Sequence, residues 1–232
     1  MKTLIIFLGE SFRLGSQNNR NIGTPESYDG QMKAGESHNK FIRFLSDKNP
    51  NNKIEVFLAT YNTPYYQDLK NYYEEFLVGE NVYDNVIGYN NLFHETISKI
   101  NTDQYDIIIS IRIDILLKDH FFDIFDINWE TIRVTFNVWF KHKCGRHPRI
   151  GDFIYFIPKK YFSYLSKFVL GHETWQMLIE HTDLTYDNID VMINTYHDSD
   201  TEKDFNPLYC IVNRPHTDIW HTQNENFDKN RL

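Results

Sequence analysis

Apolar runs recur in the first half of the sequence, and segments with helical spacing alternate with them. The runs occupy residues 4–8, 54–61 and 105–117. Runs without polar alternation are typical of strands that are covered on both faces, as in parallel sheets. Residues 31–48 and 91–100 between and beside them carry apolar side chains at helical intervals. The alternation predicts an α/β fold with a mainly parallel central sheet flanked by helices.

The second half of the chain is less regular, although it contains the same two kinds of element. The further elements expected from periodicity are strands at 85–88, 132–140 and 153–157 and helices at 64–77, 160–170, 174–180 and 186–194. No linker, repeat or low-complexity tract divides the 232 residues. A single domain over residues 1–232 is therefore expected.

Charge and composition exclude some classes of partner. The formal net charge is −8, which argues against a nucleic-acid partner because such proteins need a basic face to displace counterions. A local basic site could still hold a small phosphate ligand. The two cysteines do not form a Cys-x-x-Cys pair, and no apolar run approaches the length of a membrane span. We therefore expect a cytoplasmic protein without a membrane span.

Two charged residues interrupt the strongest apolar run. Arg112 and Asp114 are two positions apart and would project from the same face of a strand. Charges in such surroundings are costly to bury without a partner or a ligand. One interpretation is a structural ion pair between them. The other is that Asp114, at the carboxyl end of a central strand, holds a divalent metal that bridges two phosphates, with Arg112 beside it.

The segment that follows the first strand occupies the place where nucleotide-binding folds have their ligand-binding turn. It contains Gly9 and Arg13, whose backbone amides and guanidinium could contact a diphosphate, although it has neither a Walker sequence nor a GxGxxG fingerprint. The second strand ends at the same expected edge with Thr60 and Tyr61, and Tyr61 could stack on a base. Packing at the strand end is the alternative for this tyrosine.

Further candidates lie in the second half. His197, Asp198 and Asp200 combine imidazole and carboxylate groups, which suit Mn²⁺ or a similar ion, although Asp-rich segments are commonly solvated turns. Asp152 precedes an expected strand, where it could serve as a catalytic carboxylate, a turn residue or an ion-pair partner. His172 stands just before an expected helix and could line a cleft.

Together these features resemble glycosyltransferases of the GT-A type. The resemblance lies in the first strand with its ligand loop, the second strand ending in Thr60-Tyr61, and the sequence Tyr-Asp-Ile-Ile-Ile-Ser-Ile-Arg-Ile-Asp at residues 105–114. In that class an Asp-x-Asp element, or a degenerate form of it, follows a central strand and binds the metal–diphosphate of a sugar nucleotide. Here Arg112 replaces the first Asp, so the resemblance assigns a metal ligand only to Asp114.

The resemblance also implies roles for later residues. Many enzymes of the class supply a late His or Asp to the metal, which makes His197 the second expected ligand of Mn²⁺ or Mg²⁺. Asp152 matches, in its order along the chain, a carboxylate near the acceptor. Residues 1–118 would then form a nucleotide-binding half, and residues 119–232 an acceptor and metal half.

The leading hypothesis is metal-dependent transfer of a hexosyl or pentosyl group from a nucleotide-diphosphate sugar to a hydroxyl of a glycan or other acceptor. The expected nucleotide contacts are Gly9, Arg13, Thr60, Tyr61 and Arg112, and the expected acceptor-side residues are Asp152, His172, Asp198 and Asp200. Two alternatives remain: another metal-dependent enzyme, such as a nucleotidyltransferase or phosphoesterase, and a non-catalytic carbohydrate-binding module.

Overall fold

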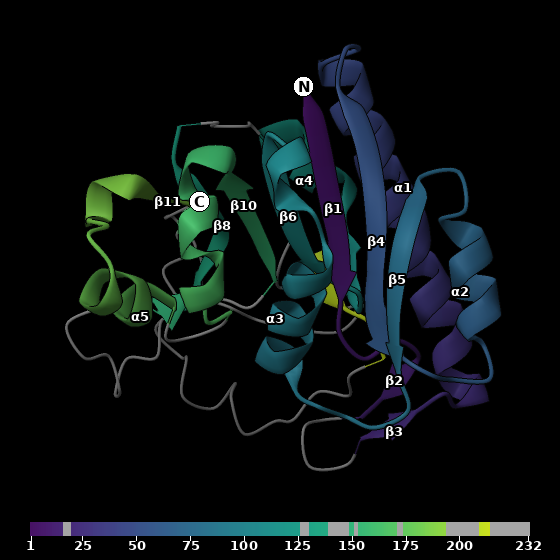
Figure 1. Ribbon diagram of the computed structural model, residues 1–232. Helices are drawn as coiled ribbons and strands as arrows, with labels where there is room; N and C mark the ends of the chain where they lie inside the picture. The colour runs from purple at the N-terminus through teal and green to yellow at the C-terminus, as the bar shows by residue number, and fades with distance from the viewer. Residues whose placement is uncertain are drawn as a thin grey trace, which may run out of the picture.

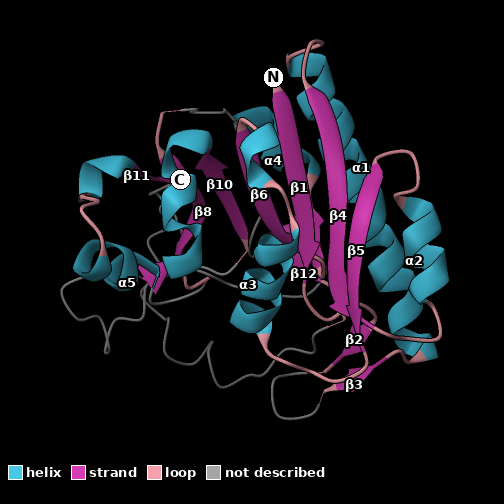
Figure 2. Cartoon of the chain, viewed as in Figure 1, coloured by secondary structure: helices cyan, strands magenta, loops and turns pink. Residues whose placement is uncertain are grey.

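The computed structural model describes residues 1–15, 20–125, 130–138, 149–150, 153–170, 174–193 and 209–213. Within these ranges the chain forms a mixed sheet flanked by helices (Figures 1 and 2). Seven strands follow one another across this sheet in the order β11-β8-β10-β6-β1-β4-β5, and β9 pairs with β8. The predicted α/β class is confirmed.

The first half of the chain builds the parallel part of the sheet. β1 (Lys2–Leu8) lies between β4 (Lys53–Tyr61) and β6 (Ile107–Arg112) and is parallel to both. β5 (Leu77–Tyr83) extends the parallel part beyond β4 and forms its edge. Because Leu8 is in register with both Ala59 and Arg112, the carboxyl ends of the three inner strands meet at one edge.

The second half contributes the mixed part of the sheet. β10 (Ile154–Pro158) is antiparallel to both β6 and β8 (Ile132–Val138). β11 (Ile189–Ile193) is parallel to β8, and β9 (Arg149–Ile150) is antiparallel to it. Two short pairs lie outside this sheet: β2 (Arg13–Leu14) with β3 (Asn21–Ile22), and β7 (Ile115–Leu117) with β12 (Tyr209–Ile211).

Helices cover both faces of the parallel strands (Figure 1). α1 (Tyr28–Lys48), α2 (Tyr66–Tyr72) and α4 (Asp119–Ile124) lie on one face, and α3 (Tyr89–Lys99) lies on the other. α5 (Thr174–His181) belongs to the second half. The short 3-10 helices are η1 (Pro25–Ser27), η2 (Thr102–Gln104), η3 (Lys159–Lys167) and η4 (Tyr186–Asn188).

The alternation of β1 explains why its sequence is apolar throughout. Ile5 and Phe7 pack in a core with Phe41 of α1, whereas Leu4, Ile6 and Leu8 pack in a second core with Leu92 and Phe93 of α3. Successive side chains of a strand point to opposite faces. With a helix layer on each face, every position of β1 after Lys2 is buried, and no polar alternation is left in the sequence.

Two predicted elements are wrong. The strand expected at 85–88 is instead β5, Leu77–Tyr83, which lacks a continuous apolar run because it is a partly exposed edge. The helix expected at 186–194 is the short η4 followed by strand β11. Its alternate β-branched residues Ile189, Val191 and Ile193 match the two-residue period of a strand.

The strand expected at 105–117 is divided into two. β6 ends at Arg112, residues 113 and 114 form a turn, and β7 leaves the main sheet to pair with β12. The Ile113 N–H donates to the Leu8 carbonyl at 2.9 Å, and the Val212 N–H donates to the Asp114 carbonyl at 2.9 Å. The helix expected at 160–170 takes the tighter 3-10 form of η3. Among the described helices, none is both long enough and apolar enough to cross a bilayer.

Candidate functional site

The candidate site lies at the edge where β1, β4 and β6 end. Gly9 follows β1, and its N–H donates to the Ala59 carbonyl at 3.0 Å. The φ of Gly9 is 127°, a backbone conformation that side-chain-bearing residues rarely adopt. This glycine therefore lets the chain turn sharply off the strand into the loop that carries the charged residues of the site.

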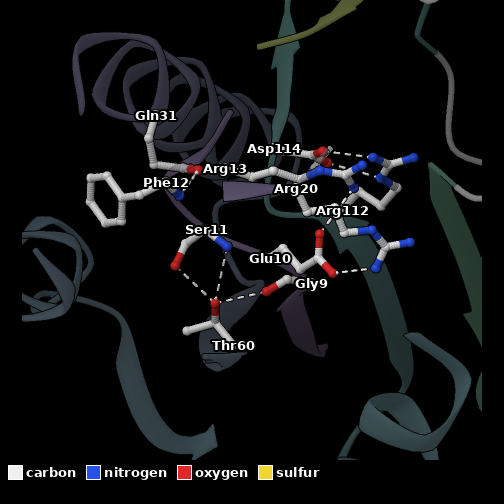
Figure 3. A network of polar contacts seen from close by, with 10 residues as sticks. All are labelled: Gly9, Glu10, Ser11, Phe12, Arg13, Arg20, Gln31, Thr60, Arg112 and Asp114. Atoms are coloured by element: carbon white, nitrogen blue, oxygen red, sulfur yellow. Dashed lines mark hydrogen bonds and ion pairs between the residues drawn. The ribbon is translucent and has the colours of Figure 1, made fainter. Parts of the chain in front are cut away.

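Thr60, near the end of β4, holds this loop from below (Figure 3). Its fully buried hydroxyl donates to the Gly9 carbonyl at 2.7 Å and accepts from the Ser11 N–H at 3.3 Å, and the Ser11 hydroxyl lies 2.9 Å away. The hydroxyl therefore hydrogen-bonds two backbone groups of the loop. We conclude that Thr60 holds the loop in position and is a supporting residue of the site.

The loop is held from the other side by Gln31 of α1. The Gln31 side chain accepts from the Phe12 N–H at 3.0 Å and donates to the Ile113 carbonyl at 2.8 Å. It therefore connects the loop after β1 to the turn after β6. Phe12 has a positive φ of 51°, and strained backbone of this kind is enriched at functional sites. Its carbonyl accepts from the Ser27 hydroxyl at 2.7 Å.

Sequence reasoning did not identify Gln31, although a signal was present. The buried positions of α1 follow a helical period, and two polar residues that are fully buried, Gln31 and His38, lie on this stripe among apolar ones. A polar residue at a core position needs hydrogen-bond partners. The pattern indicated that something polar lay opposite each of them.

Arg112 and Asp114 form a buried, two-pronged ion pair. Arg112 Nε donates to Asp114 Oδ1 at 2.9 Å, and its Nη2 donates to Oδ2 at 2.6 Å. Asp114 is only 4 % exposed, and the Arg112 guanidinium also lies 5.5 Å from the ring centroid of Phe153. The structure thus contains the ion pair that was one of the two expectations for these residues. Both carboxylate oxygens of Asp114 accept hydrogen bonds from Arg112.

A second ion-pair group lies beside the first. Glu10 Oε2 is 3.0 Å from Arg13 Nη1, and Glu10 Oε1 is 2.7 Å from Arg20 Nη1. Figure 3 shows these three side chains together with Arg112 and Asp114. We call these five residues the arginine cluster.

Arg13 occupies an unusual position within the arginine cluster. The residue is 7 % exposed, and its Nε and Nη2 have no hydrogen-bond partner in the described part of the chain. Burial lowers the pKa of Arg13 and outweighs the opposing effects of Glu10 and Asp114, while the positive charges of Arg112 and Arg20 lower this pKa further. Arg13 therefore presents desolvated, uncompensated donors at the edge of the sheet.

Tyr61 lies at the end of β4 and is buried in the core that also contains Leu8 and Leu92. Burial raises the pKa of its hydroxyl. Of the expected nucleotide contacts, Gly9, Arg13 and Arg112 thus gather around one loop, Thr60 supports that loop, and Tyr61 packs in the core beside it.

The other expected site residues, Asp152, His172, His197, Asp198 and Asp200, lie outside the described residues. Among the residues that the structure does describe, no three His, Cys, Asp or Glu side chains gather as a metal site would require. Asp114 binds Arg112 through both oxygens, and Glu10 contacts Arg13 and Arg20. In the described part of the chain, two carboxylates that each face guanidinium groups, with no His, Cys or further carboxylate gathered beside them, do not form a site that fits Mn²⁺ or Mg²⁺.

No protein-family model matches the chain, and no curated protein matches it either. Among solved structures, the chain is similar to the apo form of the glycosyltransferase GlyE of Streptococcus pneumoniae TIGR4, with 12 % identity and a TM-score of 0.36 over 81 % of this chain and 40 % of GlyE. It is also similar to an active-site mutant of LgtC, with 7 % identity and a TM-score of 0.40 over 82 % of this chain and 72 % of LgtC. The chain thus spans less than half the length of GlyE.

Proposed function

We propose that this protein is a glycosyltransferase that moves a sugar from a nucleotide-diphosphate donor to a hydroxyl of a glycan or other acceptor. The observation that carries the proposal is the buried, incompletely partnered Arg13 within the arginine cluster, at the carboxyl edge of the parallel strands. Open α/β sheets bind their ligands at this edge. Desolvated guanidinium donors at such a place suit a ligand rich in anionic oxygen.

Sugar transfer makes particular use of such a site. When the bond between the sugar and the diphosphate breaks, negative charge grows on the departing diphosphate. Positive groups that are already held in place stabilise that charge without having to reorganise. In the proposed reaction Arg13 and Arg20 contact the diphosphate, and the Gly9 turn brings the loop backbone close to it.

The acceptor side of the proposal rests on residues of the second half. Asp152 would orient an acceptor hydroxyl and take its proton as the hydroxyl attacks the sugar carbon. His172, Asp198 and Asp200 would line the acceptor side. His197, the residue expected as a late metal ligand, is their neighbour in the sequence. Residues 1–118 and 119–232 would thus supply the donor and acceptor halves of one site.

The test is a screen of UDP, GDP and dTDP sugars with purified protein, by thermal shift and by analysis of the nucleotide product. We expect one donor to raise the melting temperature and to release a nucleoside diphosphate when an acceptor is present. Release of a nucleoside monophosphate would instead identify a phosphoesterase or nucleotidyltransferase. Stabilisation by a free sugar but by no nucleotide would identify a carbohydrate-binding module, and either result would refute the proposal.

A further inference from the structure

We infer that the arginine cluster, and not a divalent cation, neutralises the diphosphate in this site. The inference rests on the proposed function for the identity of the donor, although its physical basis is the cluster itself. It departs from the metal dependence that the resemblance implies, and it identifies the positive charge with side chains of this chain.

The first reason is the state of Asp114. It is the carboxylate at the place where the resemblance puts a metal ligand, yet its two oxygens accept from Arg112 at 2.9 and 2.6 Å. A cation on these oxygens would lie against the Arg112 guanidinium and compete with it for the same carboxylate. Breaking a buried pair in this way is strongly unfavourable. Asp114 is therefore engaged in orienting Arg112.

The second reason is the balance of charge. The five residues of the arginine cluster comprise three guanidinium groups and two carboxylates, a net charge of +1 for these five residues. Arg13 is close enough to Arg112 and Arg20 for both to lower its pKa, so the positive groups of the cluster act on one another. An incoming dication would add to this repulsion, whereas an incoming diphosphate would relieve it.

The third reason is the hydrogen bonds that Arg13 does not make. Its Nε and Nη2 are shielded from solvent and, within the described residues, meet no acceptor. Buried donors in native proteins are almost always satisfied, so these two indicate a partner outside the described residues, such as a water or a ligand. Glu10 Oε2, the carboxylate oxygen nearest Arg13, also makes no hydrogen bond within those residues. A phosphate group matches these donors because guanidinium presents two parallel N–H groups that can reach two of its oxygens. A metal ion cannot satisfy a donor.

The neighbouring residues show how such a ligand would arrive. The Arg20 side chain is 38 % exposed, and it contacts the same Glu10 carboxylate as Arg13. Arg20 is thus the solvent-facing member of the arginine cluster and Arg13 the interior one. We expect a diphosphate to meet Arg20 first and then to compete with Glu10 for Arg13.

The experiment measures binding of inorganic pyrophosphate by calorimetry and thermal shift, in EDTA and in Mn²⁺. We expect pyrophosphate to bind and to stabilise the protein in EDTA, Mn²⁺ alone to cause no thermal shift, and added Mn²⁺ not to tighten pyrophosphate binding. Arg13→Gln should weaken this binding about tenfold or more, because it removes charge-assisted bonds. Arg43→Gln is the matched control, since Arg43 lies on α1 with a side chain that is 70 % exposed.

Folding of the variants is checked by circular dichroism. Arg13→Gln removes a desolvated charge while Glu10 keeps Arg20, so the variant should fold. Arg20→Gln, at a more exposed position, provides a second measurement and should also weaken binding. Pyrophosphate binding that appears only with Mn²⁺, or that survives both substitutions unchanged, would overturn the inference.

The two proposals fail in different ways. If a nucleotide sugar is turned over only with Mn²⁺, the glycosyltransferase function stands and the metal-free inference falls. If pyrophosphate binds in EDTA through Arg13 while no nucleotide sugar is bound or turned over, the inference about the anion site stands and the proposed function falls.

Discussion

His38 should make the stability of this protein fall as the solution becomes acidic. The residue is fully buried on α1, and its ring is stacked on Phe7 with centroids 4.4 Å apart. Nε2 lies 2.7 Å from the Ile115 carbonyl, which can only accept, so this nitrogen carries the proton. Nδ1 lies 2.7 Å from the Tyr73 hydroxyl and accepts from it. The site therefore holds a neutral imidazole.

The magnitude follows from the difference in pKa between the two states. Burial lowers the pKa of His38 from 6.5 to about 4, although the hydrogen bond to Ile115 and the charge of Asp114 oppose the shift. Between these values the unfolded chain binds a proton that the folded protein does not bind. The stabilisation is complete above pH 6.5 and is lost as the pH falls toward 4. Titration of His38 should therefore make the free energy of unfolding about 2 kcal/mol lower at pH 5 than at pH 8.

The assay is urea unfolding at pH 8 and pH 5, at constant ionic strength, for the wild type and for His38→Gln. Between the two pH values the wild type should lose about 2 kcal/mol more than the variant. Other groups cancel in this comparison. For Glu55, burial acts to raise the pKa, but hydrogen bonds from Lys53, Tyr105 and Lys2 outweigh it and lower the pKa to about 2 in both proteins. Equal losses in the two proteins, or a His38 ring that titrates near its ordinary pKa by NMR, would refute the reasoning.

Three further substitutions test how the site is built. Asp114→Ala should lower the free energy of unfolding by roughly 3 kcal/mol because it leaves a buried guanidinium without its carboxylate. Adding Arg112→Met should recover most of that loss. Equal stabilities of the single and double variants in urea titrations would contradict this account of the ion pair. Thr60→Val should lower the free energy of unfolding by about 1–3 kcal/mol because the Gly9 carbonyl and the Ser11 N–H lose their partner. Thr60→Ser keeps the hydroxyl and should be close to wild type. A valine variant as stable as the wild type would show that the loop does not depend on this hydroxyl. Gly9→Ala should cost roughly 1–3 kcal/mol through backbone strain at a φ of 127°, and an unchanged melting temperature would exclude that strain.

The fold class could be predicted from the periodicity of apolar residues, because burial of a strand or helix face fixes a pattern over neighbouring positions. A strand with a helix layer on each face has no polar position, as in β1, and an amphipathic helix such as α1 shows its period over many residues. β5 and β11 left weaker traces. β5 is a partly exposed edge strand, and β11 is a five-residue strand that follows directly on a helical turn. At such elements the pairing partner outweighs local preference.

The composition of the site was accessible only in part. The sequence pattern predicted Thr60 and Arg112 near strand ends and Gly9 and Arg13 in the loop that follows the first strand. The carboxyl ends of parallel strands share an edge, so their proximity followed from topology. The role of Gln31 could not be predicted from the sequence. Its two hydrogen-bond partners, the Phe12 N–H and the Ile113 carbonyl, come from different loops that only the fold brings together.

The order of residues along the chain was enough to specify a parallel α/β core and to bring an Arg and an Asp to the end of its central strand, because burial on two faces and the period of a strand are local properties. The choice between the two interpretations of that pair came from three-dimensional packing. Only in the folded chain do Glu10, Arg13 and Arg20 join Arg112 and Asp114. Electrostatic energy depends on the distance between charges and on their exposure to solvent, and the spacing of residues in the sequence determines neither quantity.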